Sequence, residues 1–230
     1  MDKLSLSIGL SNSIGEKAFD CISSLGEVGL DAIMDEGILR DIPLISTVVS
    51  TYRIGEKLTE RHHLKKLISF VEEINTGSIN EDNRIKYITK IKNNPKKRNA
   101  ELEYILVLID RYISEDKAKM LAKLYLAYLD GIIIWEELTM YAEVVDRFLI
   151  LDCGTLISAD GKVTVHRNIG GESVLRLEAL GLMAETNESS IFAATSTGVG
   201  VYPDSIQRFA SNDKTYRRTE FGNKLAEILK

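Results

Sequence analysis

Apolar residues recur every three or four positions through the first two thirds of the chain, which is the spacing of amphipathic helices. Capping residues, glycines and prolines divide this pattern into separate segments. The sequence therefore predicts helices over residues 14–34, 43–75, 82–92, 98–113, 115–130 and 135–149.

The strongest predicted helix begins after Ser114. A serine at this position caps a helix, and the two acidic residues that follow, Glu115 and Asp116, suit the positive end of the helix dipole. Its apolar positions are Ala118, Leu121, Leu124, Tyr125 and Tyr128. Gly131 ends this helix, and we expect a tight turn before the next helix begins near Trp135.

The pattern changes near Asp152. Before this residue the chain is rich in Leu, Ile and Lys, whereas Gly, Thr, Ser and Val become frequent after it. Short runs of strand character contain Val163, Val165, Ile191, Val199 and Val201. We therefore expect two domains, a helical domain over residues 1–150 and a smaller domain over residues 151–230.

Two motifs stand near the ends of the second domain. Residues 172–183 read ESVLRLEALGLM, which predicts a short helix that ends at Gly181. Residues 216–225 read YRRTEFGNKL, in which Thr219 caps the final helix. Between them, residues 193–212 form a polar stretch with glycines and a proline.

The order and spacing of these motifs resemble those of winged-helix domains, over residues 170–230. The stretch at residues 193–212 departs from the resemblance, because it is longer than a usual wing. The resemblance implies a small α+β winged-helix-like domain. Together with the helical periodicity of the preceding residues, it predicts a mainly α protein, with a helical-bundle body followed by that domain.

The body followed by this domain also resembles the abortive-infection alpha group of phage-defence proteins. The matching positions are Leu177, Leu180, Gly181, Leu182, Thr219, Gly222 and Leu225. In the body the resemblance is one of pattern and not of motif. It implies a role in bacterial defence against phage or mobile elements, and it brings no catalytic residue with it.

Composition places the chain among ordinary globular proteins. It has 230 residues, of which 44% are hydrophobic and 27% charged, with a net charge of −5.

Its two cysteines, Cys21 and Cys153, lie in apolar runs and outside any CxxC pair, so we expect buried, reduced thiols. The longest uncharged apolar run near the start, residues 42–52, is too short for a membrane span, which needs about 20 residues. We therefore expect a cytoplasmic protein.

Motifs that carry catalysis or metal binding are absent from the sequence. It contains no GxSxG, Walker A or GxGxxG motif. His62 and His63 are neighbours, and neighbours on a helix point about 100° apart, so they cannot readily share a metal ion. Ile132, Ile133 and Ile134 stand where a calcium loop needs oxygen ligands. We expect no enzymatic activity, no metal and no cofactor.

Two groups of basic residues are candidates for contact with a nucleic acid or another anionic partner. The first lies in a stretch without any acid and comprises Arg84, Lys86, Lys90, Lys92, Lys96, Lys97 and Arg98. The second lies in the winged-helix-like domain and comprises Arg176, Arg217 and Arg218. Residues 151–230 hold nine Lys and Arg against ten Asp and Glu, a net charge of −1, which disfavours binding to phosphates. A solvated surface is the alternative interpretation for both groups.

Three functional hypotheses follow. The first is a non-enzymatic interaction or effector protein that works with a protein partner or as a homo-oligomer. The second is a winged-helix regulator that binds DNA. The third is a membrane-active protein that uses residues 14–54, although the acidic character of this segment opposes binding to anionic lipids. If the segment instead forms an oligomer interface, its apolar contacts are Ile45, Val48, Val49 and Tyr52.

Overall fold

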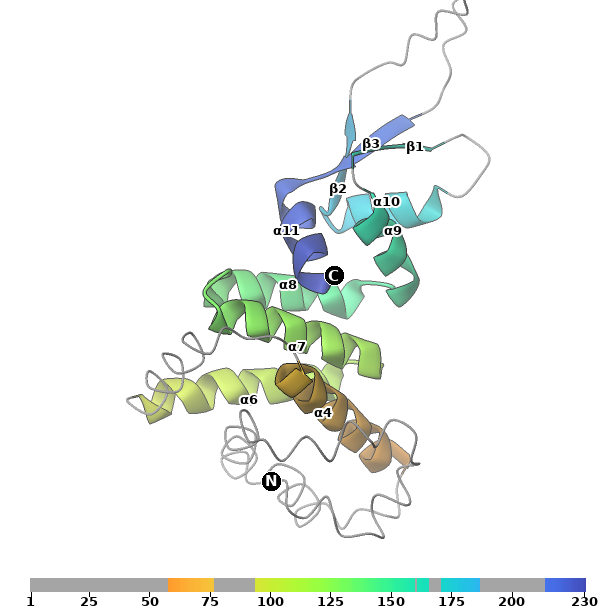
Figure 1. Ribbon diagram of the computed structural model, residues 1–230. Helices are drawn as coiled ribbons and strands as arrows, with labels where there is room; N and C mark the ends of the chain where they lie inside the picture. The colour runs from red at the N-terminus through yellow and green to blue at the C-terminus, as the bar shows by residue number, and fades with distance from the viewer. Residues whose placement is uncertain (1–57, 77–93, 160, 166–170, 187–213) are drawn as a thin grey trace, which may run out of the picture. The chain divides into compact units, whose positions relative to one another are not determined.

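The computed structural model describes residues 58–76, 94–159, 161–165, 171–186 and 214–230. The chain divides into two compact units, one ending at Arg147 and the other covering Phe148–Ile228 (Figure 1). The predicted helices at 14–34 and 82–92, and the first part of the one at 43–75, lie outside the described residues.

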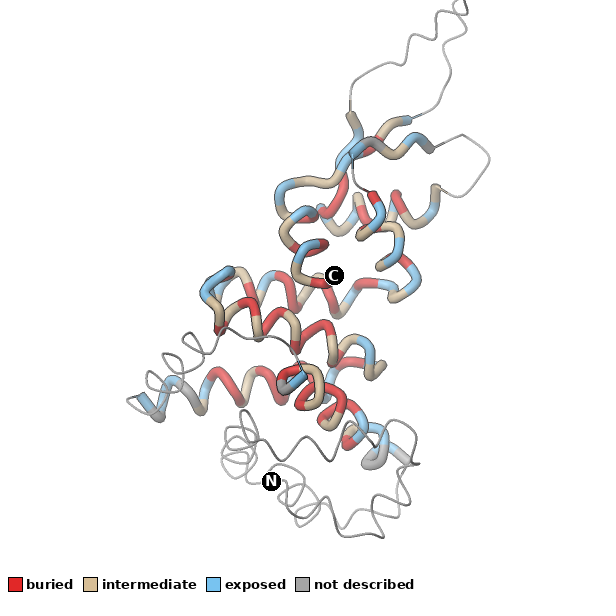
Figure 2. Tube along the Cα trace, viewed as in Figure 1, coloured by how far each residue is buried: buried red, intermediate tan, exposed pale blue. Residues whose placement is uncertain are grey.

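The first unit contains four α-helices among its described residues. These are α4 (Leu58–Thr76), α6 (Pro95–Arg111), α7 (Glu115–Leu129) and α8 (Trp135–Arg147). Helix α7 packs against both α4 and α8, and α4 also contacts α6. Their buried faces appear as red stripes in Figure 2 and include Leu64, Leu67, Phe70, Leu102, Ile105, Leu121, Leu124, Leu138 and Val145. Burial of these apolar side chains is the main force that holds the helices together.

The ends of these helices follow from capping chemistry. The Ser114 hydroxyl accepts a hydrogen bond from the Lys117 amide at 3.3 Å, as expected for the cap of α7. Gly131 ends α7 with a φ of 73°, a conformation that other residues rarely adopt. Helix α6 begins at Pro95 and not near Arg98, because the Asn94 side chain accepts from the Lys97 amide and proline suits the first helical turn.

The second unit combines short helices with a small sheet. Its elements are η4 (Ile150–Asp152), α9 (Cys153–Ser158), β1 (Lys162–Val165), α10 (Glu172–Ala179), β2 (Met183–Thr186), β3 (Lys214–Arg218) and α11 (Glu220–Leu229). The strands form an antiparallel sheet in the order β1-β3-β2, with Val163 opposite Tyr216 and Glu185 on its other side. The predicted fold class, mainly α with a small α+β part, is confirmed.

The two sequence motifs of the second unit meet in space. Gly181 has a φ of 73° and turns the chain from α10 into β2. The Thr219 amide donates to the Leu182 carbonyl at 3.0 Å, and the Thr219 hydroxyl donates to the Gly181 carbonyl at 2.8 Å. Gly222, one turn into α11, lies so close to Leu182 that a Cβ at this position would overlap the Leu182 carbonyl. The motifs therefore encode a contact between the ends of α10 and α11.

Two further expectations concern the cysteines and the predicted strands. Cys153 is half-buried and not fully buried, whereas Cys21 lies outside the described residues. Val163 and Val165 lie in β1 as predicted, but Ile191, Val199 and Val201 fall outside the described ranges.

Candidate interaction surface

The predicted basic stretch is only partly visible in the structure. Arg84, Lys86, Lys90 and Lys92 lie outside the described residues, as does the side chain of Arg98. Lys96 and Lys97 are exposed in the first turn of α6, where Lys97 Nζ lies 3.8 Å from a carboxylate oxygen of Glu101. The predicted oligomer contacts Ile45, Val48, Val49 and Tyr52 also lie outside the described residues.

Arg176 is engaged inside the second unit. Its guanidinium donates two hydrogen bonds to the Asp152 carboxylate, from Nε at 2.8 Å and from Nη2 at 2.6 Å, and a third to Ser173 at 3.2 Å. Asp152 is only 1% exposed, and these hydrogen bonds lower the pKa of its carboxyl group against the opposing effect of burial. Arg176 therefore ties η4 to α10 and is not presented as a phosphate contact.

The other two predicted arginines lie on β3 and face opposite ways, because side chains alternate along a strand. Arg217 is exposed, whereas Arg218 is half-buried and its Nη1 donates to the Leu156 carbonyl at 3.4 Å. The structure therefore does not bring Arg176, Arg217 and Arg218 together into one basic surface.

The exposed side of α10 is acidic and apolar. It presents Glu172, Leu175 and Ala179, which recur at helical spacing, and Leu175 is 50% exposed. A helix that reads DNA needs basic or hydrogen-bonding side chains on this side to reach phosphates and bases. Glu172, Leu175 and Ala179 provide no such basic group.

Aromatic side chains from three helices of the first unit form a continuous cluster. The Trp135 ring lies 5.7 Å from the Tyr104 ring and 5.5 Å from the Tyr128 ring, both in edge-on geometry. All three side chains are partly exposed. Such pairs are more favourable than their buried area alone suggests, so they hold α6, α7 and α8 in a fixed arrangement.

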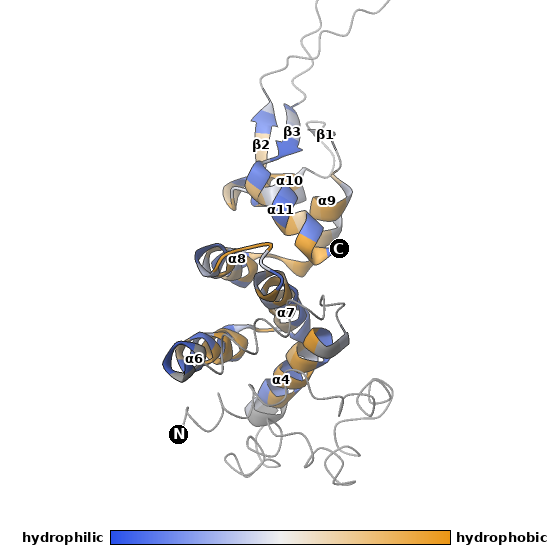
Figure 3. Ribbon diagram, turned by 60° about the vertical axis from the view of Figure 1, so that its left-hand side comes forward, coloured by the Kyte–Doolittle hydropathy of each residue, from blue (hydrophilic) through white to orange (hydrophobic). Residues whose placement is uncertain are grey.

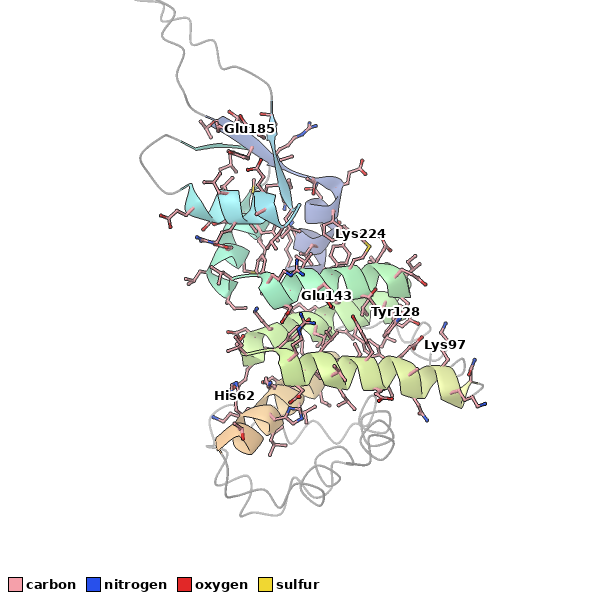
Figure 4. The ribbon with its side chains drawn as sticks, turned by 180° about the vertical axis from the view of Figure 1, so that it is seen from behind. His62, Lys97, Tyr128, Glu143, Glu185 and Lys224 are labelled. Carbon is pink, nitrogen blue, oxygen red and sulfur yellow. The ribbon has the colours of Figure 1, made fainter. Side chains whose placement is uncertain are left out.

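Polar contacts place α6 beside α8. Arg111 lies 2.6 Å from the Asp146 carboxylate and 3.4 Å from that of Glu143, and the Tyr112 hydroxyl donates to the Ala142 carbonyl at 2.9 Å. In Figure 4, Tyr128 and Glu143 lie in the interval between the two helices, and Lys97 lies at the beginning of α6. The two helices therefore share one outward surface.

Both helices also expose large apolar side chains. Val107 on α6 is 48% exposed and Met140 on α8 is 57% exposed. Ile113 is the only exposed large apolar residue that lies outside this surface among the described residues of the first unit. We call this surface the α6–α8 face and define it by Tyr104, Val107, Trp135, Met140 and the turn residues Ile132 and Ile134.

The turn between α7 and α8 supplies its isoleucines and appears orange in Figure 3. Ile133 is buried, whereas its neighbours Ile132 and Ile134 are 57% and 60% exposed. The Ile132 amide donates to the Ala127 carbonyl at 2.9 Å, and the Ile134 amide donates to the Glu137 carboxylate at 3.0 Å. These bonds fix the turn, so the two exposed isoleucines are held in place.

A buried carboxylate lies beneath the face. Glu101 is 5% exposed and accepts a hydrogen bond from the Tyr128 hydroxyl at 3.0 Å. Burial, followed by the charge of Glu101, raises the pKa of Tyr128, so its phenol remains a hydrogen-bond donor at neutral pH. Tyr128 is thereby held against both Glu101 and Trp135.

A second polar cluster joins α4 to the end of α6. Lys66, which is 3% exposed, donates to the Asp110 carbonyl at 2.8 Å and to the Tyr112 carbonyl at 2.7 Å. His62 contacts the Ile113 carbonyl, and His63 Nδ1 lies 3.2 Å from the Asp110 carboxylate. The contacts of Lys66 and His62 satisfy carbonyls at the end of α6, which is a structural task. No group of three or more potential ligands is placed to hold a metal ion in the part of the chain that the structure describes.

Sequence reasoning missed the α6–α8 face. Its aromatic residues are separated in the sequence, because Trp135 comes 31 positions after Tyr104 and 7 positions after Tyr128. The available signal was the run Ile132-Ile133-Ile134 directly before Trp135, because a turn is normally polar and this one carries three large apolar residues.

Comparison with known proteins gives no relative. No protein-family model, curated protein or solved structure matches this chain. Within the described residues, no helix has both the length and the apolar character that a membrane crossing requires.

Proposed function

We propose that this chain is a non-enzymatic interaction or effector protein that binds another protein surface through the α6–α8 face. The observation that carries the proposal is the exposure of four large apolar side chains on α6, on α8 and in the turn before α8, namely Val107, Ile132, Ile134 and Met140. Trp135 joins these elements through its ring contacts with Tyr104 and Tyr128. Clustered apolar and aromatic side chains on a surface are typical of protein interfaces, in which Trp and Tyr contribute much of the binding energy.

We propose in addition that residues 151–230 form a winged-helix-like module that serves packing or protein contact. The element order α9-β1-α10-β2-β3-α11 and the sheet order β1-β3-β2 support this proposal. The acidic and apolar exposed side of α10, and the engagement of Arg176 by Asp152, favour a protein contact over the alternative role of binding DNA.

The biological setting that we propose is cytoplasmic defence against phage or mobile elements. It is supported by the resemblance to abortive-infection alpha proteins at Gly181, Leu182, Thr219 and Gly222. In the second unit these four residues form one contact, so the resemblance concerns a part of the chain with a defined structural role.

A plating assay with a panel of phages tests the proposal. Bacteria that express the chain should reduce plating of at least one phage, and replacing both Ile132 and Ile134 by Ser should abolish most of that protection. Because both side chains are exposed, their replacement should leave the fold intact. The matched control is Ile113→Ser, since Ile113 is 81% exposed but lies outside the α6–α8 face. Equal protection by the double variant and the wild type would contradict the role of the face.

A further inference from the structure

The described part of the chain begins beside one end of the α6–α8 face. Helix α4 starts at Leu58, and one turn later His62 contacts the carbonyl of Ile113, just after the end of α6. At this same end of α6, Arg111 is paired with carboxylates of α8. In Figure 4, His62 lies near one end of α6 and Lys97 lies near the other. The chain therefore enters α4 at the Arg111 end of the face.

The sequence shortly before α4 carries an apolar run. Residues 42–52 read IPLISTVVSTY and contain no charged side chain, although Asp41 and Arg53 flank them. Apolar side chains of this run that recur at helical spacing are Ile45, Val48, Val49 and Tyr52. Such a run gains free energy when another apolar surface covers it.

The exposed apolar side chains of α6 and α8 are within reach of this run. Only residues 53–57 separate the run from α4, and a connection of this length spans at most about 20 Å. Along α6, Val107 lies four residues before Arg111, which is a rise of about 6 Å. Along α8, Met140 lies three residues before Glu143, the partner of Arg111, which is a rise of about 4.5 Å.

We propose that residues 42–52 lie on the α6–α8 face of their own chain, against Val107 and Met140, until a partner displaces them. As a helix these residues extend about 16 Å, and Trp135 lies about 12 Å from Glu143 along α8, so the run also covers the indole. The turn isoleucines lie beyond Trp135 and stay open for the first contact with a partner. The inference rests on the proposed function, since it concerns the regulation of that same face.

The charges of the face favour an uncharged occupant. Arg111 is paired with two carboxylates of α8, and Lys97 Nζ lies 3.8 Å from a carboxylate oxygen of Glu101. A charged segment would compete with these pairs, whereas residues 42–52 bring no charge and leave them intact.

Covalent attachment favours a segment of the same chain over a separate molecule. A segment tethered by a short connection has an effective concentration on the order of millimolar at its binding surface. A contact that would be weak between separate molecules is therefore populated within one chain.

Disulfide trapping in the full chain, with both native cysteines replaced by serine, tests the contact. Val48→Cys and Val107→Cys should join within one chain under mild oxidation, as followed by non-reducing electrophoresis and mass spectrometry. The matched control combines Val48→Cys with Lys65→Cys, because Lys65 is exposed on α4 only about 10 Å from Leu58 and a segment that is not docked reaches it readily. The Val107 pair should form at least about tenfold faster. Equal rates for the two pairs would overturn the inference.

Charges introduced into the run give an independent readout. Replacing both Val48 and Val49 by Glu should release the run, so acrylamide quenching of Trp135, the only tryptophan, should rise about twofold. The matched control, Thr47→Glu with Ser50→Glu, adds the same charge on the opposite side of the helical stripe and should quench as the wild type does. Both results should be independent of protein concentration, because the contact lies within one chain. Unchanged quenching in the Val48 and Val49 variant would contradict the proposed cover.

The outcomes separate this inference from the proposed function. If trapping and quenching both fail while the Ile132 and Ile134 double variant loses phage protection, the inference fails and the proposed function stands. If residues 42–52 are trapped on Val107 while that double variant protects as well as the wild type, the contact stands and the role of the face in defence fails. If both stand, the released Val48 and Val49 variant should reduce phage plating further than the wild type does, because a partner no longer competes with the run. Plating equal to that of the wild type would then overturn the regulatory role of the contact.

Discussion

At the residue scale, Gly222 has the least room for a side chain among the glycines that the structure describes. A Cβ built there would overlap the backbone carbonyl of Leu182, and backbone atoms cannot move aside as a flexible side chain can. We predict that Gly222→Ala destabilises the second unit by at least about 3 kcal/mol. Gly154→Ala in α9 is the control, because a Cβ there meets nothing within 4 Å, and it should stabilise by about 0.5 kcal/mol. Urea unfolding measures both, and equal stability of the two variants would contradict the close approach.

Asp152 and Arg176 should respond unequally to mutation. Arg176→Gln leaves a carboxylate without its partner at a site that is 1% exposed, whereas Asp152→Asn leaves a guanidinium that is 39% exposed and reaches water. At about pH 7 the midpoint temperature of thermal unfolding should therefore fall further in Arg176→Gln than in Asp152→Asn.

The same pair has a predictable pH dependence. In the wild type the pKa of Asp152 is lowered, chiefly by hydrogen bonds from Arg176, so its stabilising contribution is present above its ordinary pKa of 3.8 and is lost as the pH falls through the lowered value. In Arg176→Gln the lost partner no longer favours the charged form, and lowering the pH from about 7 toward about 4 should narrow the gap to Asp152→Asn. A gap that is constant with pH would contradict this account.

At the element scale, α4 is tied to the end of α6 by side chains that include a partly buried histidine. Burial lowers the pKa of His63 below 6.5, and the charges of Lys66 and His62 act in the same direction, whereas Asp110 opposes them. The unfolded chain therefore takes up a proton at higher pH than the folded chain does. Stability is fully present above about pH 6.5 and decreases as the pH falls through the ordinary value toward the lowered one.

We predict that His63→Gln flattens this dependence. The difference in unfolding free energy between about pH 7.5 and about pH 5 should be smaller in the variant than in the wild type, as measured by urea unfolding. The other two histidines are present in both proteins, so the comparison isolates His63. Equal pH slopes would show that protonation of His63 does not oppose the contact between α4 and α6.

Elements were predictable where a local signal marks their ends. Ser114 and Gly131 bound α7 as expected, because a hydroxyl cap and a left-handed glycine are properties of a few neighbouring residues. The start of α6 was misplaced, because Asn94 and Pro95 both end one pattern and begin the next. A cap satisfies amides that follow it, so these two residues serve the later helix.

At the scale of the whole molecule, the fold class was predictable and the candidate site was not. Helical periodicity and the change in composition near Asp152 sufficed for a mainly α chain with a small α+β part. The α6–α8 face depends on how three helices meet, which brings Tyr104 to Trp135 across 31 positions. Arg176 is likewise only a candidate for contact with a phosphate in the sequence, which gives no sign that Asp152 occupies its guanidinium.

Phage plating with the Met140→Glu variant tests the central claim most directly. Met140 is 57% exposed on α8, so a charge there should leave the free energy of unfolding nearly unchanged while it disturbs an apolar contact surface. We predict that this variant loses most of the protection that the wild type gives, whereas Ile113→Glu, at a side chain that is 81% exposed and outside the α6–α8 face, retains it. Protection by Met140→Glu equal to that of the wild type would contradict the account.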